Sequence, residues 1–361
     1  MAAAGHHYYK PFLGCLMMLE KTIRLFVLSA VLTIASTMSV AKAEQSLEMA
    51  APFTANMILQ RQTDVPIWGF DLPGAKVTVD FAGQSKTAIA NEHGDWMVKL
   101  DPLDVSRTER QLNVTNDRDE SIVLGGVLVG EVWFSSGQSN MVWTAGQSMC
   151  RDIAREIASS EKDIPIREIN INTVSALYPQ KRATSDDGWK THKSASSFSA
   201  LSLSFAHQLY KELDTPIGIL LSAHSNTRIE AFTQRQAIED HPKLGQDAEL
   251  IRSADPLTEQ GRNSFQQYEK DIRAWQKEAG QAAIAGGKLP SRPNLPGIAG
   301  MWRGPSQFFS GKINPVVPYA IRGAIWCQGT SNSGDGRVYA CLLYTSPSPR
   351  DQRGSRMPSS A

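Results

Sequence analysis

The chain has 361 residues, of which 41% are hydrophobic and 20% are charged, with 27 glycines and 19 prolines. Such a composition excludes a disordered, a collagen-like or a disulfide-dense protein, and at about 150 residues per domain the length predicts two or three domains. The formal net charge of +1 argues against a dedicated nucleic-acid binder. Because the two ends carry +3 and +2, residues 44–340 carry −4 and are mildly acidic.

Residues 1–43 have the pattern of a secretory signal peptide. Lys21 and Arg24 precede an apolar run that ends at Val40, and residues 41–43 (Ala-Lys-Ala) supply the small side chains that a signal peptidase reads. The apolar run is about 16 residues long, shorter than the roughly 20 that a membrane-spanning helix needs. The pattern therefore predicts export to the periplasm or the extracellular space, with no membrane attachment of the mature form.

Residues 341–361 are rich in Ser, Pro and Arg, which is typical of a disordered tail. Their first part, CLLYTSPSPRD, is also one reading frame of a common transposase-type sequencing adapter. We therefore expect this segment to be non-native, and the natural gene to continue past Ala340.

Residues 44–126 are predicted to form a small β-sandwich domain. Apolar and polar residues alternate over 76–81, which is typical of a half-buried strand. Turn-forming residues cluster at 91–95 and at 116–119, between further short β-type runs.

Residues 127–340 show a different pattern, in which buried strands alternate with helices. Nearly continuous apolar runs predict strands that are buried on both faces at 127–135, 217–222 and 320–327. Helical spacing of apolar residues marks 198–213 and 262–279. This order predicts an α/β domain with an open, mostly parallel sheet and helices on both faces.

Polar residues follow each of these strands, where ligands bind in such sheets. The segments are 136–141 (SGQSNM), 222–230 (SAHSNTRIE) and 326–332 (WCQGTSN). Ser139 lies between small residues at a strand-to-helix turn, which can expose its hydroxyl and place helix N–H groups near an oxyanion. A serine at such a turn is more often an N-cap. No His, Cys or Asp cluster has the spacing of metal ligands, so we expect no metal and no cofactor.

The same segments resemble the sialate O-acetylesterase family of SGNH-type hydrolases. The similar motifs occur in the family's order from about residue 47 to 339, and the most specific is G-E-V-W-x-x-S-G-Q-S-N-M over 130–141. The others lie at 59–61, 68–69, 216–218, 318–323 and 326–332. The resemblance implies an SGNH/flavodoxin-like three-layer sandwich over residues 127–340. It also implies a secreted enzyme that removes O-acetyl groups from sialic acid or a related sugar.

The resemblance assigns roles to five residues. Ser139 matches the nucleophile. The backbone at Ser225 and Asn226 would hold the oxyanion together with the Gln328 side chain, with Asn332 as the second choice. Ser225 and Asn226 replace the two glycines of the family's S-W-G-G-T motif, which removes the conformational freedom of glycine from this loop.

The segment that should supply the catalytic base is missing from the sequence. A serine nucleophile needs a base and an orienting carboxylate, which the family takes from a late Asp-x-x-His segment, and no such spacing occurs here. Among the seven histidines only His224 follows a predicted strand, at a position where the family has Trp. We therefore expect that the chain is truncated after Ala340, unstable and inactive, whereas its full-length parent is an esterase.

Two other functions stay open. Cys327 and Thr330 replace a Tyr and a Glu of the family's W-Y-Q-G-E-S-N motif, so the chain could be a secreted carbohydrate-binding protein with a degenerate hydrolase domain. The same chemistry could also act on acetylated plant or algal polysaccharides. In each case the partner is an acetylated carbohydrate rather than nucleic acid or a membrane. Cys150 and Cys327 are expected either to form a disulfide or to remain free thiols.

Overall fold

The computed structural model describes residues 47–334 and 336–345. The expected signal peptide over 1–43 and residues 346–361 of the expected non-native tail lie outside the described residues. Within the described part, no helix is both long enough and apolar enough to cross a membrane.

The secondary structure changes from strands to alternating strands and helices along the chain. The strands are β1 (Glu48–Met49), β2 (Ile58–Gln60), β3 (Val65–Phe70), β4 (Lys76–Phe81), β5 (Gln84–Ile89), β6 (Asp95–Leu100), β7 (Ser106–Asn116), β8 (Ser121–Gly137), β9 (Ile166–Asn170), β10 (Ile217–Ala223) and β11 (Gly323–Cys327). The α-helices are α2 (Ser139–Val142), α3 (Arg151–Ser159), α4 (Ala200–Leu213), α5 (Arg235–Glu239), α6 (Gly245–Ala254), α7 (Glu259–Ile284) and α8 (Gly336–Thr345).

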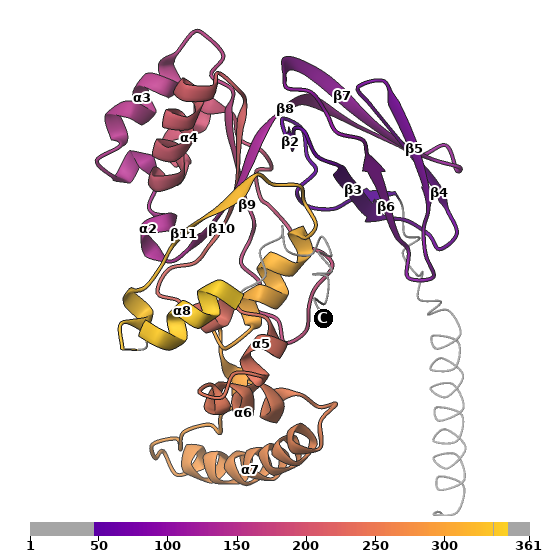
Figure 1. The fold of residues 1–361 in the computed structure, drawn as a ribbon. Coiled ribbons are helices and arrows are strands. Elements are labelled where there is room, and N and C mark those ends of the chain that lie inside the picture. The colour runs from indigo at the N-terminus through magenta and orange to yellow at the C-terminus, as the bar shows by residue number, and fades with distance from the viewer. Residues whose placement is uncertain (1–46, 335, 346–361) are drawn as a thin grey trace, which may run out of the picture. The chain divides into compact units, whose positions relative to one another are not determined.

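Most strands belong to one large sheet in the order β5-β4-β7-β8-β10-β9, in which β2 and β11 also pair with β8. Figure 1 shows β8 running from the β-rich residues toward the strands β9, β10 and β11. β8 pairs antiparallel with β7 and, from Glu131 to Gly137, parallel with β10. A second sheet joins β1, β3 and β6.

The alternation predicted in the β-rich residues is confirmed. β4 buries Val77, Val79 and Phe81, whereas its first residue, Lys76, is exposed and Thr78 and Asp80 are half-buried. The predicted turn near 116–119 joins β7 to β8 as an antiparallel pair.

The predicted domain boundary at 126/127 falls inside β8, so the β-rich residues and the parallel sheet share this strand. Arg167 of β9 connects the same two regions, because its buried guanidinium donates hydrogen bonds to the backbone oxygens of Asn56 and Gly126. The described residues accordingly form one compact unit.

The parallel strand β10 is covered on both faces, as its apolar run predicts. Along β10, Ile219 and Leu221 pack into the core beneath α4, whereas Leu220 between them packs into the core on the opposite face. Phe308 and Tyr319, from the segment before β11, belong to this second core. The structure therefore has a mixed α/β fold with a central multi-stranded sheet.

The two predicted helices are present and begin at side-chain caps. Ser199 accepts a hydrogen bond from the Ser202 N–H at the start of α4, and Thr258 accepts one from the Gly261 N–H at the start of α7. Such caps satisfy backbone donors that the first helical turn leaves unpaired. α4 ends at Asp214, which adopts a left-handed conformation.

The C-terminal elements differ from the expectation. The strand predicted over 320–327 begins only at Gly323 and is partly exposed, because β11 pairs with β8 on one side and no other described strand covers its second edge. α8 runs past Ala340 into the segment expected to be non-native, and there Leu342 packs in a core with Ile229 and Ile298.

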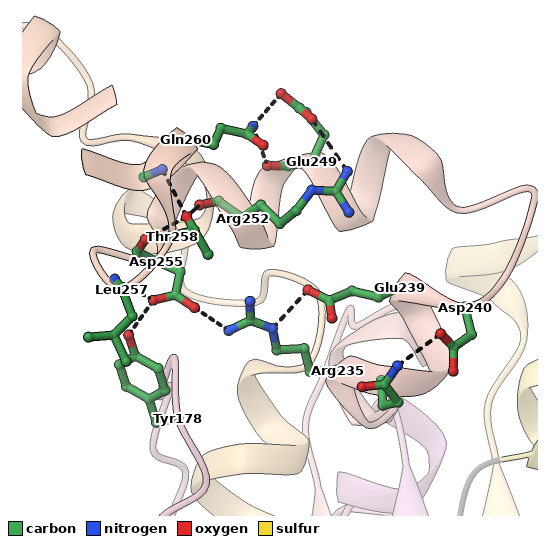
Figure 2. A network of polar contacts seen from close by, with 12 residues as sticks. Tyr178, Arg235, Glu239, Asp240, Glu249, Arg252, Asp255, Leu257, Thr258 and Gln260 are labelled. Atoms are coloured by element: carbon green, nitrogen blue, oxygen red, sulfur yellow. Dashed lines mark hydrogen bonds and ion pairs between the residues drawn. The ribbon is translucent and has the colours of Figure 1, made fainter. Parts of the chain in front are cut away.

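A network of hydrogen bonds and ion pairs connects two of the helices that follow β10, α5 and α6. Figure 2 shows Asp255, at the end of α6, between Tyr178 and Arg235. The Tyr178 hydroxyl and the Arg235 guanidinium each donate a hydrogen bond of 2.5 Å to the Asp255 carboxylate. Arg235 also donates to Glu239 on its own helix at 2.9 Å. The network thus joins α5 and the end of α6 to the loop that follows β9.

Candidate active site

The carboxyl ends of β8, β10 and β11 lie side by side, and short backbone contacts hold them together. The Gln138 N–H donates to the Cys327 oxygen at 3.0 Å, and the His224 N–H donates to the Gly137 oxygen at 3.0 Å. Gly137 has a φ of 137°, and a Cβ at this position would lie 2.1 Å from the Cys327 oxygen. Only glycine fits this crossing, so the motif residue Gly137 sets how closely the strand ends approach.

Ser139 is the first residue of α2, directly beyond this crossing. It is half-buried, and the helix is anchored by Met141, which is fully buried two residues later. Among the residues that the structure describes, none forms a hydrogen bond with the Ser139 hydroxyl. The serine thus stands at the helix N-terminus, where backbone N–H groups can stabilise negative charge.

The loop after β10 brings Ser225 and Asn226 to the same edge of the sheet, and both are exposed. Asn226 has a φ of 51°, so the loop keeps the left-handed conformation that the family's glycine would adopt easily. Asparagine tolerates this conformation better than most residues. Arg303 donates to the carbonyl oxygens of Ser225 (3.4 Å) and Asn226 (2.9 Å), which orients the loop from its carbonyl side.

Gln328 lies at the end of β11 with its amide already engaged. Its Nε2 donates to the Thr227 oxygen at 3.0 Å and to Asn332 Oδ1 at 2.8 Å, and its Oε1 is buried without a partner among the described residues. Both N–H groups are therefore in use, and Gln328 would have to give up one of these bonds to bind an oxyanion. That role stays a prediction.

Asn332 is held from two sides and is 4% exposed. Its Oδ1 accepts from the Ile229 N–H at 2.9 Å, and its Nδ2 donates to the Glu230 carboxylate at 3.0 and 3.1 Å. Glu230 is itself 2% exposed and accepts a further hydrogen bond of 2.7 Å from Arg228. The Asn332 amide is thus directed at Glu230 rather than at Ser139.

Glu230 is the site residue that sequence reasoning missed. A carboxylate inside the apolar run Ile229–Phe232 was the available signal, because a buried acid is retained only where partners compensate its charge. Here Asn332 and Arg228 are those partners.

His224 contacts residues other than Ser139. Its Nδ1 lies 3.4 Å from the Thr173 hydroxyl, and its ring centre lies 4.8 Å from that of Phe308. Burial lowers the pKa of His224, and the nearby positive charges of Lys312 and Arg303 lower it further. No described carboxylate hydrogen-bonds its ring, so the structure shows no His–Asp pair at this position.

Lys312 is a buried lysine that contacts the end of β10. It lies on a π-helical turn, η5 (Phe309–Ile313), and is 2% exposed. Its Nζ donates to the Ala223 oxygen at 2.8 Å and to the Thr173 hydroxyl at 3.0 Å, and no described carboxylate forms an ion pair with it. Burial lowers the pKa of Lys312 to about 7.

The two cysteines near the strand ends are free thiols. Cys150 Sγ lies 3.1 Å from the Ser204 hydroxyl, and Cys327 is half-buried at the end of β11. The described residues also contain no group of three or more His, Cys, Asp or Glu side chains arranged to hold a metal ion.

A mixed α/β sheet with a half-buried serine beyond its central strand places the chain in an architecture that hydrolases use. No protein-family profile matches the chain. Sialate O-acetylesterases do match it: the rat protein is 26% identical over 315 residues, and the human protein is 30% identical over 207 residues. These matches cover 80% and 51% of this chain, and 53% and 38% of the relatives. The chain thus spans about half the length of the rat protein that it matches, and the match covers less than half of the human protein.

A solved structure shares the fold. A carbohydrate acetylesterase from Xanthomonas citri superposes with a TM-score of 0.58 at 23% identity, covering 80% of this chain and 52% of that one. The resemblance to sialate O-acetylesterases is therefore confirmed, and the homologues are carboxylic ester hydrolases by name.

Proposed function

We propose that this chain carries the nucleophile and the oxyanion-binding loops of a carbohydrate O-acetylesterase of the SGNH type, exported through its residues 1–43. The observation that supports this most is the position of Ser139. It starts a helix beyond the central strand β8, beside the loops that follow β10 and β11. The proposed substrate is sialic acid, or a related sugar, that carries an O-acetyl group, as the names of the relatives suggest.

In the proposed reaction the Ser139 oxygen attacks the acetyl carbonyl carbon and its proton passes to a base. The N–H groups of Ser139, Ser225 and Asn226 stabilise the tetrahedral oxyanion, because none of the described residues accepts a hydrogen bond from them. The C–O bond to the sugar then breaks, and the sugar oxygen takes the proton. Water finally attacks the acetyl-enzyme and releases acetate, which regenerates the serine.

Among the described residues, none hydrogen-bonds the Ser139 hydroxyl and so none is in place to act as the base. The sequence has no Asp-x-x-His segment, and His224 is engaged with Thr173 and Phe308. We therefore propose that this chain binds the acetylated sugar but turns it over very slowly. A positioned base contributes roughly 10²–10⁴-fold to such reactions.

Chemical rescue with imidazole tests both parts of the proposal. Acetate release from O-acetylated N-acetylneuraminic acid and from acetylated xylan is measured for the chain and for Ser139→Ala, with and without imidazole. We expect the two proteins to be equal without imidazole, and the chain alone to gain at least about tenfold with it. Strong Ser139-dependent release of acetate without imidazole would refute the proposal that the protein lacks a base. Equal release under all conditions would refute serine catalysis by Ser139.

A non-catalytic carbohydrate-binding protein is the second candidate. It is favoured by Gln328, whose two N–H groups are both donated within the protein rather than offered to a ligand. This function predicts measurable affinity for the acetylated sugar together with no acetate release at any imidazole concentration.

A further inference from the structure

A small, mostly enclosed cavity opens beside α2 at the carboxyl ends of β9 and β10. Its volume is 230 Å³. Buried residues of the two strands and of the α4 cap line it, with more exposed residues around them. Its lining includes Val142, Glu168, Asn170, Lys190, Leu221 and Ala223. Parallel α/β sheets bind ligands at such strand ends.

The cavity adjoins the element that carries Ser139. Val142 lines the cavity and lies three residues after Ser139 on α2, and residues at this spacing share one face of a helix. Ala223, which also lines the cavity, pairs in register with Gly137, two residues before Ser139. A molecule that presents an ester to Ser139 can therefore extend along this face of α2 into the cavity.

Glu168 gives the cavity its chemical character. Its side chain is only 4% exposed, and both carboxyl oxygens accept from the Ser199 N–H, at 3.1 and 3.2 Å. The charged group nearest to it in the lining is Lys190, whose ammonium is paired with Asp187 at 2.6 Å. β10 and α4 contribute no titratable side chain to the lining.

Burial raises the pKa of Glu168 to about 8, against the weaker opposing effects of the Ser199 hydrogen bond and the Lys190 charge. The carboxyl group is therefore protonated at neutral pH and carries an O–H donor. Among the described residues, the Ser199 N–H is the hydrogen-bond partner of this carboxyl group. A group in the cavity can accept a hydrogen bond from its O–H, and buried donors rarely stay unpaired.

We propose that this cavity is a subsite for a hydroxyl-bearing part of the acetylated sugar, with the buried Glu168 carboxyl as the group that hydrogen-bonds to it. The cavity is smaller than the roughly 300 Å³ at which whole-ligand pockets begin, so it fits part of one sugar ring rather than an oligosaccharide. Apolar Val142 and Leu221 beside polar Glu168 and Asn170 suit a sugar, which has both apolar faces and hydroxyl edges. This inference rests on the proposed function.

Calorimetric binding of O-acetylated N-acetylneuraminic acid tests the subsite. All proteins carry Ser139→Ala, so that no turnover disturbs the measurement. Glu168→Gln keeps a donor and an acceptor and should bind within about twofold of the Ser139→Ala protein. Glu168→Leu loses the donor and should bind about tenfold more weakly, since one such hydrogen bond is worth about that factor. Glu161→Leu, at an exposed position, is the matched control and should not change the affinity.

A pH series keeps the test decisive if Glu168→Leu does not fold. With a pKa of about 8, ionisation of Glu168 should weaken binding about fourfold between pH 6.5 and 8.5, whereas the Glu168→Gln protein should bind equally at both. If Glu168→Leu binds as well as the control, or if Glu168→Gln shows the same pH dependence, the subsite is refuted. If the Ser139→Ala protein binds no acetylated sugar at any pH, the proposed function itself fails.

Discussion

Replacing Lys312 by methionine should change how the stability of the protein depends on pH. Burial holds the pKa of Lys312 at about 7 in the folded protein, against an ordinary value of 10.5. Between these values the unfolded chain carries a proton on this lysine that the folded protein has lost. The contribution of Lys312 to the free energy of unfolding therefore rises with pH across this window, and Lys312→Met lacks this contribution.

The size of the effect follows from the two pKa values. A pKa difference of one corresponds to about 1.4 kcal/mol, so the full window from pH 7 to 10.5 is worth about 5 kcal/mol. Between pH 7 and pH 9 the expected rise is about 2 kcal/mol. Loss of the two Lys312 hydrogen bonds in the variant lowers its stability equally at both pH values, so it does not affect the comparison.

Urea unfolding of both proteins at pH 7 and pH 9 measures this difference. His224 and Glu168 are present in both proteins, so the difference between the two pH profiles reports the contribution of Lys312. Lys270→Met on the exposed face of α7 is the control and should follow the native sequence at both pH values. Parallel pH profiles for Lys312→Met and the native sequence would show that the buried lysine does not titrate in this window.

Two further substitutions test the strand crossing and the carboxylate behind it. Gly137→Ala places a Cβ 2.1 Å from the Cys327 oxygen at a φ of 137° and should lower the free energy of unfolding by about 3 kcal/mol, measured by urea unfolding. A loss below about 1 kcal/mol would contradict the tight crossing. Glu230→Ala removes the acceptor of the buried Asn332 amide and should cost about 2–4 kcal/mol, with thermal unfolding as the readout. An unchanged melting temperature would argue against that network.

Much of the fold could be predicted from the hydrophobic pattern of the sequence. The burial of two strands could not, and each case has a physical cause. Burial of β10 on both faces could be read from a continuous apolar run, and α4 from its helical spacing. β11 is as apolar as β10 yet partly exposed, because pattern alone does not show whether a strand lies at the edge of its sheet. β9 contains Arg167 and Glu168, two charged residues that are nonetheless buried, and so it lacks the apolar run that marks a buried strand.

The candidate site was predictable in its position and less so in its hydrogen bonds. The motif around Ser139 and its place after β8 could be derived from the sequence. The direction of the Gln328 and Asn332 amides could not, because it depends on Thr227 and Glu230, whose contacts with them span about a hundred positions along the chain.

The length of β8 limits where the chain can accept an inserted or a deleted residue. Its first half is in register with β7 and its second half with β10 and β11. One residue added between these halves would turn every following side chain of the strand to the opposite face and would move Gly137 away from Cys327. A change of length inside β8 would therefore separate the two regions that this one strand joins.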